Sequence, residues 1–427
     1  MIIKCDDFII TDNSKDAKNG VYFLKDNSNA KYENDALSKG AIIIDEIKAR
    51  ELLGINEDIK IIAITGTNGK TTTAAAIYSM LLDLGEKAFL CGTRGAFCND
   101  EKVGDKNLTT PFLLEFLHYL QIATQNDCKY FVMEVSSHAI DQQRLGKQTK
   151  FSAKIYTNLT QDHLDYHKSF ENYAKTKESF FADDCLKIIN NDAYKINYNY
   201  KNSITYGIDN PSFYSVKAYS LNDGIDAVVS FSKNTFHIKS ELVGLFNLYN
   251  LLSAFACINE LVKPDLEKLE IAMESFGGVK GRMQVIVKNV IVDFAHTPDG
   301  IQKVCDSLKH KKLIVVVGAG GNRDKTKRPL MAQIAKHYAK TLILTSDNPR
   351  DEEPKDIIND MLSGLDDKNG VEVIEDRFMA IKRALELQKD DEMVLVLGKG
   401  DEDYQEIKGV KHHFSDEETI LKLTKGE

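Results

Sequence analysis

The chain has 427 residues, of which 43% are hydrophobic, and it carries a formal net charge of −9. This length predicts about two or three domains rather than a single core. The acidic balance argues against nucleic acid as the main partner, and no run of about 20 apolar residues indicates a membrane-spanning helix. The seven scattered cysteines include no C-x-x-C pair, which favours reduced thiols over a disulfide framework or a zinc knuckle. We therefore expect a soluble, cytoplasmic α/β protein without a signal peptide.

Short β-rich runs alternate with helical patterns, as in parallel sheets joined by crossover helices. Residues 1–59 predict a small N-terminal α/β module, residues 60–280 a central parallel sheet with a P-loop, and residues 281–427 a C-terminal Rossmann-like, doubly wound sheet. An alternating stretch at 212–242 predicts an antiparallel appendage to the central domain. The expected strands are 21–24, 41–45, 60–64, 87–91, 130–135, 152–157, 187–190, 290–293, 312–317, 341–345 and 393–397.

The strand expected at 60–64 runs into a glycine-rich loop and then into a helix at 71–84. The loop reads Thr65-Gly66-Thr67-Asn68-Gly69-Lys70-Thr71-Thr72-Thr73. A strand, a glycine-rich loop and a helix in this order indicate a phosphate site, because N–H groups at a helix N-terminus bind anions. Lys70 would supply charge to the outer phosphates of ATP, and the Thr71 hydroxyl is suited to Mg²⁺. Ile64 stands where the usual P-loop has its first glycine, so the loop is a variant, and a plain strand–helix turn is the alternative.

An acidic residue, Glu134, ends the apolar run 130–133, at the expected carboxyl edge of the sheet beside the loop. This is the Walker-B position for a carboxylate that holds Mg²⁺. His163 and His167 follow the strand at 152–157 and stand four residues apart, a spacing that could instead hold zinc. Because no nearby Glu or Cys completes a zinc set convincingly, we favour magnesium.

Nine motifs, in order along the chain, resemble those of the Mur ligases of peptidoglycan synthesis. They are TGTNGKTTT (65–73), EVSSH (134–138), TNLTQDHLDYH (157–167), GLFNLYN (244–250), GRM (281–283), DFAHTPD (293–299), GGNRDK (320–325), DNPR (347–350) and GKGDEDY (398–404). The resemblance covers nearly the whole chain and is weakest before residue 60. Within that family, the resemblance is strongest to the members that form the muramoyl tripeptide. It implies a three-domain enzyme that uses ATP to phosphorylate the γ-carboxylate of D-glutamate and then joins the acyl phosphate to an amine.

The resemblance also implies a metal and catalytic set. Thr71, Glu134, His163 and Lys177 would hold Mg²⁺, with Lys177 carbamylated by CO2, and the implied catalytic residues are Lys70, His163 and Lys177. Carbamylation turns a cation into an anion with oxygen ligands, which a magnesium site can use. Lys175 is the competing position. Without the family pattern, both lysines would read as solvated helix charges.

Further contacts implied by the resemblance fall into three groups. The ATP-side residues are Gly66, Thr67, Asn68, Gly69, Lys70, Thr71, Thr72, Asn247, Asn250 and His296. The UDP-substrate residues are Ser14, Thr109, Thr110, Ser136, Gln142 and Arg144. The amino-acid residues are Arg323, Asp347, Asn348, Pro349, Arg350, Gly398 and Glu402. An arginine suits a carboxylate or pyrophosphate, whereas an asparagine in a turn is more often a cap.

The sequence DNPR follows the strand at 341–345, at the edge where α/β sheets bind ligands. Taken alone, it reads equally well as a turn followed by a surface charge. In the family it implies meso-diaminopimelate as the incoming amine, whose distal carboxylate Arg350 could hold bidentately. L-Lysine as the incoming amine lacks this carboxylate and would leave a buried arginine unpaired, which can give discrimination against lysine on the order of 10⁴-fold.

We expect a monomer whose partners are ATP, UDP-N-acetylmuramoyl-dipeptide and meso-diaminopimelate, with neither nucleic acid nor membrane. The alternatives are a lysine-adding or other Mur-type ligase, a folylpolyglutamate synthase and an inactive P-loop binding protein. Intact Lys70, Glu134, His163 and Lys177 argue against the inactive protein.

Overall fold

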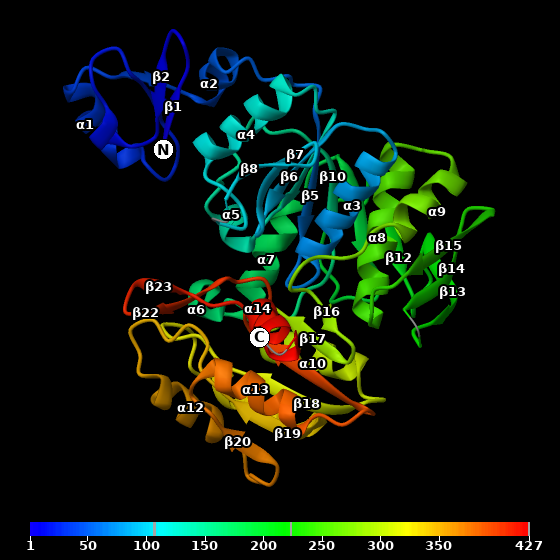
Figure 1. The fold of residues 1–427 in the computed structure, drawn as a ribbon. Helices are drawn as coiled ribbons and strands as arrows, with labels where there is room; N and C mark the ends of the chain where they lie inside the picture. The colour runs from blue at the N-terminus through cyan, green and yellow to red at the C-terminus, as the bar shows by residue number, and fades with distance from the viewer. Residues whose placement is uncertain (106–107, 223, 426–427) are drawn as a thin grey trace. The chain divides into compact units, whose positions relative to one another are not determined.

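The computed structural model describes residues 1–105, 108–222 and 224–425, and in these ranges the chain forms four β-sheets with helices around them (Figure 1). The chain divides into two compact units. Unit 1 comprises Met1–Tyr219, Asp226–Ser240 and Leu248–Phe276, and unit 2 comprises Ser220–Ile225, Glu241–Asn247 and Gly277–Glu427. The mixed α/β architecture confirms the predicted fold class. The three domains at 1–59, 60–280 and 281–427 remain a proposal.

The chain begins with a small four-stranded sheet in the order β1-β2-β3-β4. β1 pairs antiparallel with β2, whereas β2, β3 and β4 run parallel. Its inward residues, among them Ile10, Phe23 and Leu24, are fully buried. The elements are β1 Ile2–Lys4, β2 Ile9–Thr11, β3 Tyr22–Leu24, β4 Ile42–Ile44, α1 Glu33–Ser38 and α2 Glu46–Leu52, with 3-10 turns at Ser14–Asp16 and Ala30–Tyr32.

Unit 1 is built on an eleven-stranded sheet in the order β15-β14-β13-β12-β11-β10-β5-β9-β6-β7-β8. The strands from β13 through β10, β5 and β9 to β6 pair in parallel, and β7 and β8 are antiparallel additions at one edge. The strands are β5 Lys60–Thr65, β6 Ala88–Gly92, β7 Gly95–Cys98, β8 Glu101–Gly104, β9 Tyr130–Glu134, β10 Phe151–Tyr156, β11 Leu186–Asn190, β12 Ser203–Gly207, β13 Tyr214–Ser220, β14 Ile225–Phe231 and β15 Asn234–Ser240.

Crossover helices cover this sheet. α3 packs against β5, β6 and β9 and is buried nearly all round, because its residues are mostly small or apolar. It ends before Gly85, whose left-handed φ of 80° closes the helix. The helices are α3 Lys70–Asp83, α4 Leu113–Gln125, α5 Ser137–Asp141, α6 Leu164–His167, α7 Phe170–Phe180, α8 Leu245–Leu261 and α9 Leu266–Glu274.

The stretch at 212–242, predicted as an antiparallel appendage to the central domain, forms strands of the main sheet. Its strands β13, β14 and β15 continue the main sheet, and β13 pairs in parallel with β12. The alternating pattern is real, since β15 alternates exposed and buried residues along its length. Alternation reports that one face is covered, but it does not report which strand lies next to which.

Unit 2 contains a six-stranded sheet in the order β16-β17-β21-β18-β19-β20, parallel except for β16. β17, β18, β19 and β21 are buried hydrophobic strands, as is typical of a sheet with helices on both faces. The strands are β16 Gln284–Val287, β17 Val290–Asp293, β18 Lys312–Val317, β19 Ala339–Leu344, β20 Val371–Val373, β21 Glu392–Leu397, β22 Tyr404–Ile407 and β23 Val410–His413. The helices are α10 Pro298–Ser307, α11 Lys327–Tyr338, α12 Pro354–Leu362, α13 Arg377–Leu387 and α14 Asp416–Lys425. β22 and β23 form an antiparallel hairpin of their own.

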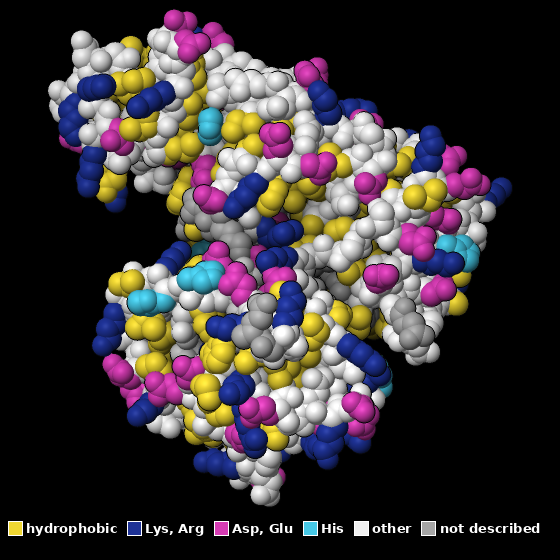
Figure 2. All heavy atoms as spheres, viewed as in Figure 1, with side chains coloured by type: hydrophobic (Ala, Val, Ile, Leu, Met, Phe, Trp, Pro, Cys, Tyr) yellow, Lys and Arg dark blue, Asp and Glu magenta, His cyan; other side chains and the backbone are white. Residues whose placement is uncertain are grey.

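On the face drawn in Figure 2, Lys and Arg side chains lie among Asp and Glu side chains on both units. Within the described ranges, every helix is too short or too polar to cross a bilayer.

Candidate active site

The P-loop follows β5, the strand between β10 and β9, and ends at Gly69, the N-cap of α3. Gly69 has a φ of 86°, and a Cβ there would overlap Oδ1 of Asn250, so only glycine fits. A Cβ on Gly66 would likewise overlap the Thr157 hydroxyl. Lys70 folds back over the loop, its ammonium donating to the carbonyls of Gly66 at 2.9 Å and Thr67 at 3.0 Å. The predicted loop therefore has the strand, turn and helix N-terminus that phosphate binding requires.

Two residues after β10 form hydrogen bonds with this loop. Asn158 accepts from Asn68 N–H at 2.9 Å and donates to the Asn68 carbonyl at 3.0 Å, and its own carbonyl accepts from Thr67 N–H at 2.9 Å. The Thr157 hydroxyl donates to the same Asn68 carbonyl at 2.6 Å. Both residues belong to the TNLTQDHLDYH motif, but neither was predicted as a site residue. Their position at the end of a strand parallel to β5 was the available signal.

The carboxylate of Glu134 lies beside the first turn of α3, as its position at the end of β9 predicts. Its Oε2 accepts from the Thr71 hydroxyl at 2.9 Å, and Oε1 accepts from Thr93 N–H at 2.9 Å. The side chain is 2% exposed. A buried carboxylate next to a hydroxyl is a donor set that suits Mg²⁺, which prefers oxygen ligands and takes its others from phosphates and water. Thr93 was missed by the sequence analysis.

Lys177 is buried on α7, with 1% of its surface exposed, whereas Lys175 on the same helix is exposed. Its ammonium contacts the Thr65 hydroxyl at 3.3 Å and lies 4.9 Å from the centre of the Tyr173 ring. Burial lowers the pKa of Lys177 well below its usual value, and the nearby charge of Lys70 lowers it further, against a smaller opposing effect of Asp162. The solvated-charge interpretation is therefore wrong for Lys177.

His163 caps α6 with a left-handed φ of 52°. Its Nε2 lies 3.4 Å from Asp162 Oδ2, and its ring meets that of His138 edge-on at 5.0 Å. His167 is buried and its Nε2 lies 2.9 Å from the Ser137 hydroxyl. In the part of the chain that the structure describes, no three His, Cys, Asp or Glu side chains gather as a metal site. Of the predicted metal residues, Thr71 and Glu134 are in direct contact at 2.9 Å, and ATP would supply further oxygen ligands.

The residues predicted for the UDP-substrate form one connected polar group beside Glu134. The Thr110 hydroxyl donates to the Glu134 carbonyl at 3.0 Å and accepts from Ser136 N–H at 2.9 Å. Arg144 donates to the Thr110 carbonyl at 3.1 Å and to Gln142 Oε1 at 2.8 Å. Thr109 joins them indirectly, since its hydroxyl lies 3.2 Å from that of Thr93. Five of the six predicted residues thus lie together.

Ser14 begins the 3-10 turn between β2 and β3 of the N-terminal module, where its carbonyl accepts from the Lys39 ammonium. An open hollow of about 680 Å³ occupies the same module. It is lined by Lys25, Asp26, Asn27, Ala30, Glu33, Ile43, Ile44, Asp45 and Lys48. Ser14 is not in that lining, and the sequence analysis singled out none of the residues that are.

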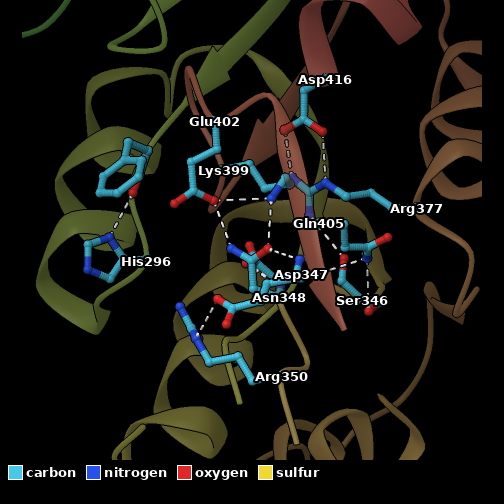
Figure 3. Close-up of polar contacts among 12 residues, drawn as sticks. His296, Ser346, Asp347, Asn348, Arg350, Arg377, Lys399, Glu402, Gln405 and Asp416 are labelled. Carbon is cyan, nitrogen blue, oxygen red and sulfur yellow. Dashed lines mark hydrogen bonds and ion pairs between the residues drawn. The ribbon is translucent and has the colours of Figure 1, made fainter. Parts of the chain in front are cut away.

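In unit 2, the DNPR segment forms a tightly bonded loop after β19 (Figure 3). Asn348 donates to Glu402 Oε2 at 2.8 Å, and its Oδ1 lies 3.3 Å from the buried ammonium of Lys399. Lys399 in turn lies 3.1 Å from Glu402. Pro349 lies so close to Gly321 that a Cβ added at position 321 would overlap the Pro349 carbonyl oxygen. The loop and the GKGDEDY motif, far apart in sequence, thus meet as one polar group.

Arg350 is the one member of DNPR that is not buried. Its Nη1 donates to the Gly321 carbonyl at 2.9 Å, and its Nε lies 3.3 Å from Glu406. The Arg350 side chain is 21% exposed. A buried ion pair between Arg377 and Asp416 lies next to the loop (Figure 3), and Arg377 also donates to the carbonyl of Ser346, the residue before DNPR, at 3.4 Å.

The remaining predicted residues lie in separate settings. Arg323 is exposed and makes no hydrogen bond or ion pair with the described part of the chain, while Gly398, at a φ of 113°, packs against the Asp347 carboxylate. His296 is exposed, with Nδ1 2.9 Å from the Phe294 carbonyl. Asn247 donates to the Val243 carbonyl at 2.9 Å. For these four residues, the contacts neither assign nor remove a ligand role.

Comparison with known proteins decides the family. The Mur ligase middle domain matches residues 64–258, and the Mur ligase glutamate ligase domain matches residues 281–400. The chain belongs to the Mur ligase family. Mur ligases are ATP-dependent amide ligases, so this Mur ligase is an enzyme that forms an amide at the expense of ATP.

Several individual proteins are similar to this chain over most of its length. A UDP-N-acetylmuramoyl-L-alanyl-D-glutamate--2,6-diaminopimelate ligase of Wolinella succinogenes is 46% identical over 96% of this chain and 95% of its own. The ligase of the same name from Helicobacter pylori is 46% identical over 94% of this chain and 91% of its own. A solved structure of a ligase of that name matches with a TM-score of 0.69 at 30% identity, covering 99% of this chain and 97% of the other. A folylpolyglutamate synthase from Mycobacterium tuberculosis matches with a TM-score of 0.67 at 15% identity over 83% of this chain and 92% of its own, which shows a shared fold alone.

Proposed function

We propose that this Mur ligase adds meso-diaminopimelate to UDP-N-acetylmuramoyl-L-alanyl-D-glutamate in the cytoplasm, as a monomer, during peptidoglycan precursor synthesis. Its relatives at 46% identity over nearly the whole chain are ligases of that name. The observation that carries the choice of amine is the DNPR loop, in which Arg350 keeps part of its side chain exposed and Asn348 donates to Glu402. A zwitterion needs an arginine for its carboxylate and an acceptor for its ammonium, and this loop offers both.

ATP would bind with its phosphates on the loop from Gly66 to Thr72, where backbone N–H groups and α3 favour negative charge. Lys70 already lies over this loop and can turn to the outer phosphates. Thr71 and Glu134, in contact at 2.9 Å, would hold Mg²⁺, and we infer His163 and Lys177 as further members of that site. The metal ion, when bound, supplies positive charge against the repulsion between a carboxylate and a triphosphate.

Lys177 would act as a carbamate. CO2 reacts with a neutral amine, and burial beside Lys70 favours the neutral form of this lysine. The product carries oxygen atoms and a negative charge, which suit a magnesium site better than an ammonium does. Both the burial and the neighbouring cation support this assignment.

The muramoyl dipeptide would lie along the polar group of Thr109, Thr110, Ser136, Gln142 and Arg144. This group adjoins Glu134 through the Thr110 hydroxyl, which would bring a substrate carboxylate close to the ATP phosphates. We assign the N-terminal sheet, with Ser14 and the hollow lined by Lys25 and Lys48, to the UDP end. This assignment follows the family resemblance, because the two lysines share the lining with the carboxylates of Asp26, Glu33 and Asp45.

The reaction then has two steps. A γ-carboxylate oxygen of D-glutamate attacks the γ-phosphorus of ATP and ADP leaves, giving an acyl phosphate. The amine of diaminopimelate attacks the acyl carbon, its proton is lost, and phosphate leaves with the former carboxylate oxygen. Positioning both reactants is the main contribution of the side chains.

A phosphate-release assay tests the choice of amine. We expect release only when ATP, Mg²⁺, UDP-N-acetylmuramoyl-dipeptide and meso-diaminopimelate are all present, with L-lysine at least about 10²-fold poorer in kcat/KM. Preference for lysine would contradict the role given to Arg350. Absence of release with any amino acid would contradict the ligase assignment itself.

A further inference from the structure

Glu406, on β22, contacts the DNPR loop through three separate atoms. Its N–H donates to Asn348 Oδ1 at 2.9 Å, and its carbonyl accepts from Arg350 N–H at 3.0 Å. Its carboxylate Oε2 lies 3.3 Å from Arg350 Nε. Glu406 lies beyond the GKGDEDY motif, and the sequence analysis gave it no role.

The backbone of Arg350 is held in a conformation that a non-glycine residue seldom adopts, with a φ of 52°. The β22–β23 hairpin stabilises it, because Glu406 accepts from its N–H and Lys408 N–H donates to its carbonyl at 2.8 Å. The hairpin therefore fixes where the arginine side chain starts. Such a local distortion persists only where surrounding contacts enforce it.

The guanidinium is then fixed at two of its three nitrogens. Nη1 donates to the Gly321 carbonyl at 2.9 Å, and Nε pairs with Glu406 at 3.3 Å. An arginine has five N–H donors in a rigid plane, so two anchored nitrogens determine where the remaining donors point. Those remaining donors lie on Nη2 and on the second hydrogen of Nη1, which together form the edge that grips a carboxylate.

We propose that Glu406 is a positioning residue for the incoming amino acid: its carboxylate orients Arg350 so that the free edge of the guanidinium meets the distal carboxylate of a diamino diacid. This inference rests on the proposed function. It also changes the basis of selectivity, because Glu406 pairs with Arg350 whether or not a substrate carboxylate is present. Lysine is then rejected for lacking a carboxylate that fits an oriented donor edge, rather than for leaving an arginine unpaired.

The opposite effect of Glu406 is competition, since a carboxylate near Arg350 reduces its attraction for another anion. Orientation outweighs competition here, because the side chain of Glu406 is 26% exposed and water screens its charge. A misplacement of about 1 Å in a positioning group can cost on the order of 10²-fold in rate. The two effects predict opposite signs for the same variants.

Glu406→Ala removes the ion pair but keeps both backbone contacts, and Glu406→Gln keeps an oxygen that can accept from Nε. We expect Glu406→Ala to raise the KM for diaminopimelate about ten-fold, with kcat and the KM for ATP within about two-fold of wild type. Glu406→Gln should recover most of that loss. The matched control is Glu353→Ala, because Glu353 is 69% exposed and lies only 3.6 Å from Lys408 of the same hairpin. It should leave every constant unchanged.

Two analogues separate orientation of Arg350 from general damage to the loop. L-2-Aminopimelate keeps the distal carboxylate but lacks the distal amine, and L-lysine lacks the distal carboxylate. Glu406→Ala should raise the KM for diaminopimelate and the KM for 2-aminopimelate by the same factor and leave the KM for lysine unchanged. The selectivity for diaminopimelate over lysine, measured as the ratio of kcat/KM values, should therefore fall about ten-fold.

A lower KM for diaminopimelate in both Glu406 variants would show competition and overturn the proposal, as would an equal loss with lysine. If wild-type enzyme does not use diaminopimelate, the proposed function fails. If it does and both Glu406 variants behave like wild type, this inference alone fails.

Discussion

At the scale of single residues, Lys177 shows how much burial alone can change. Lys175 and Lys177 are two residues apart on α7, yet one is exposed and the other is 1% exposed. No local pattern distinguishes them, because the packing of α7 on the sheet determines which side turns inward. The sequence alone therefore could not show that Lys177 is buried rather than solvated.

Replacement of Lys177 tests its role in the metal site. We expect Lys177→Ala to lower turnover by about 10²-fold or more, because the variant loses an oxygen-ligand anion where charge must be offset. Added bicarbonate should not restore the rate, since alanine cannot form a carbamate. Rates of phosphate release with all substrates present provide the measurement.

Lys175→Ala is the matched control for this variant, being on the same helix and exposed, and it should behave like wild type. A near-normal rate for Lys177→Ala would remove this lysine from the site.

Residues that support a site were harder to find in the sequence than residues that motifs name. The position of Glu134 at the end of an apolar strand predicted that it lies beside the P-loop, and in the structure it contacts Thr71 there. Asn158, Thr93 and Glu406 were missed, since a polar residue after a strand usually belongs to a turn. Their contacts depend on strands and loops that come together only in the folded chain.

At the scale of elements, the helix after the P-loop was predicted at 71–84 and runs from Lys70 to Asp83. Its signals were strong, with glycines at both ends and small or apolar residues between them. Short strands such as β7, β8 and the β22–β23 hairpin were missed, because four residues with mixed polarity carry too little periodicity.

The two ends of α3 offer a matched pair of glycine variants. Gly69 and Gly85 have left-handed φ values of 86° and 80°, but a Cβ on Gly69 would overlap Asn250 whereas a Cβ on Gly85 meets open space. Each alanine should cost about 1–2 kcal/mol of stability from the backbone strain. Only Gly69→Ala should also raise the KM for ATP, by about ten-fold or more, because its clash displaces the phosphate loop.

Thermal unfolding and ATP titrations of both glycine variants measure these effects. An unchanged KM for ATP in Gly69→Ala would argue that α3 does not begin at the nucleotide phosphates.

At the scale of the whole molecule, the class of fold was readable and the order of strands was not. Parallel α/β sheets follow from buried strands alternating with helices, and both large sheets have that form. The place of β5 between β10 and β9 puts the P-loop, Glu134 and the residues after β10 at one edge. That order depends on pairings between strands about 70 to 90 residues apart, which single-sequence periodicity does not encode.

Central to the proposed function is that this Mur ligase uses ATP to phosphorylate a carboxylate, which gives an acyl phosphate. The most direct measurement uses UDP-N-acetylmuramoyl-L-alanyl-D-glutamate labelled with ¹⁸O in its γ-carboxylate and mass spectrometry of the released phosphate. We expect one labelled oxygen in each phosphate formed together with the amide, because the carboxylate oxygen that attacks ATP leaves with the phosphorus. Phosphate without label, formed at the rate of the amide, would contradict the account.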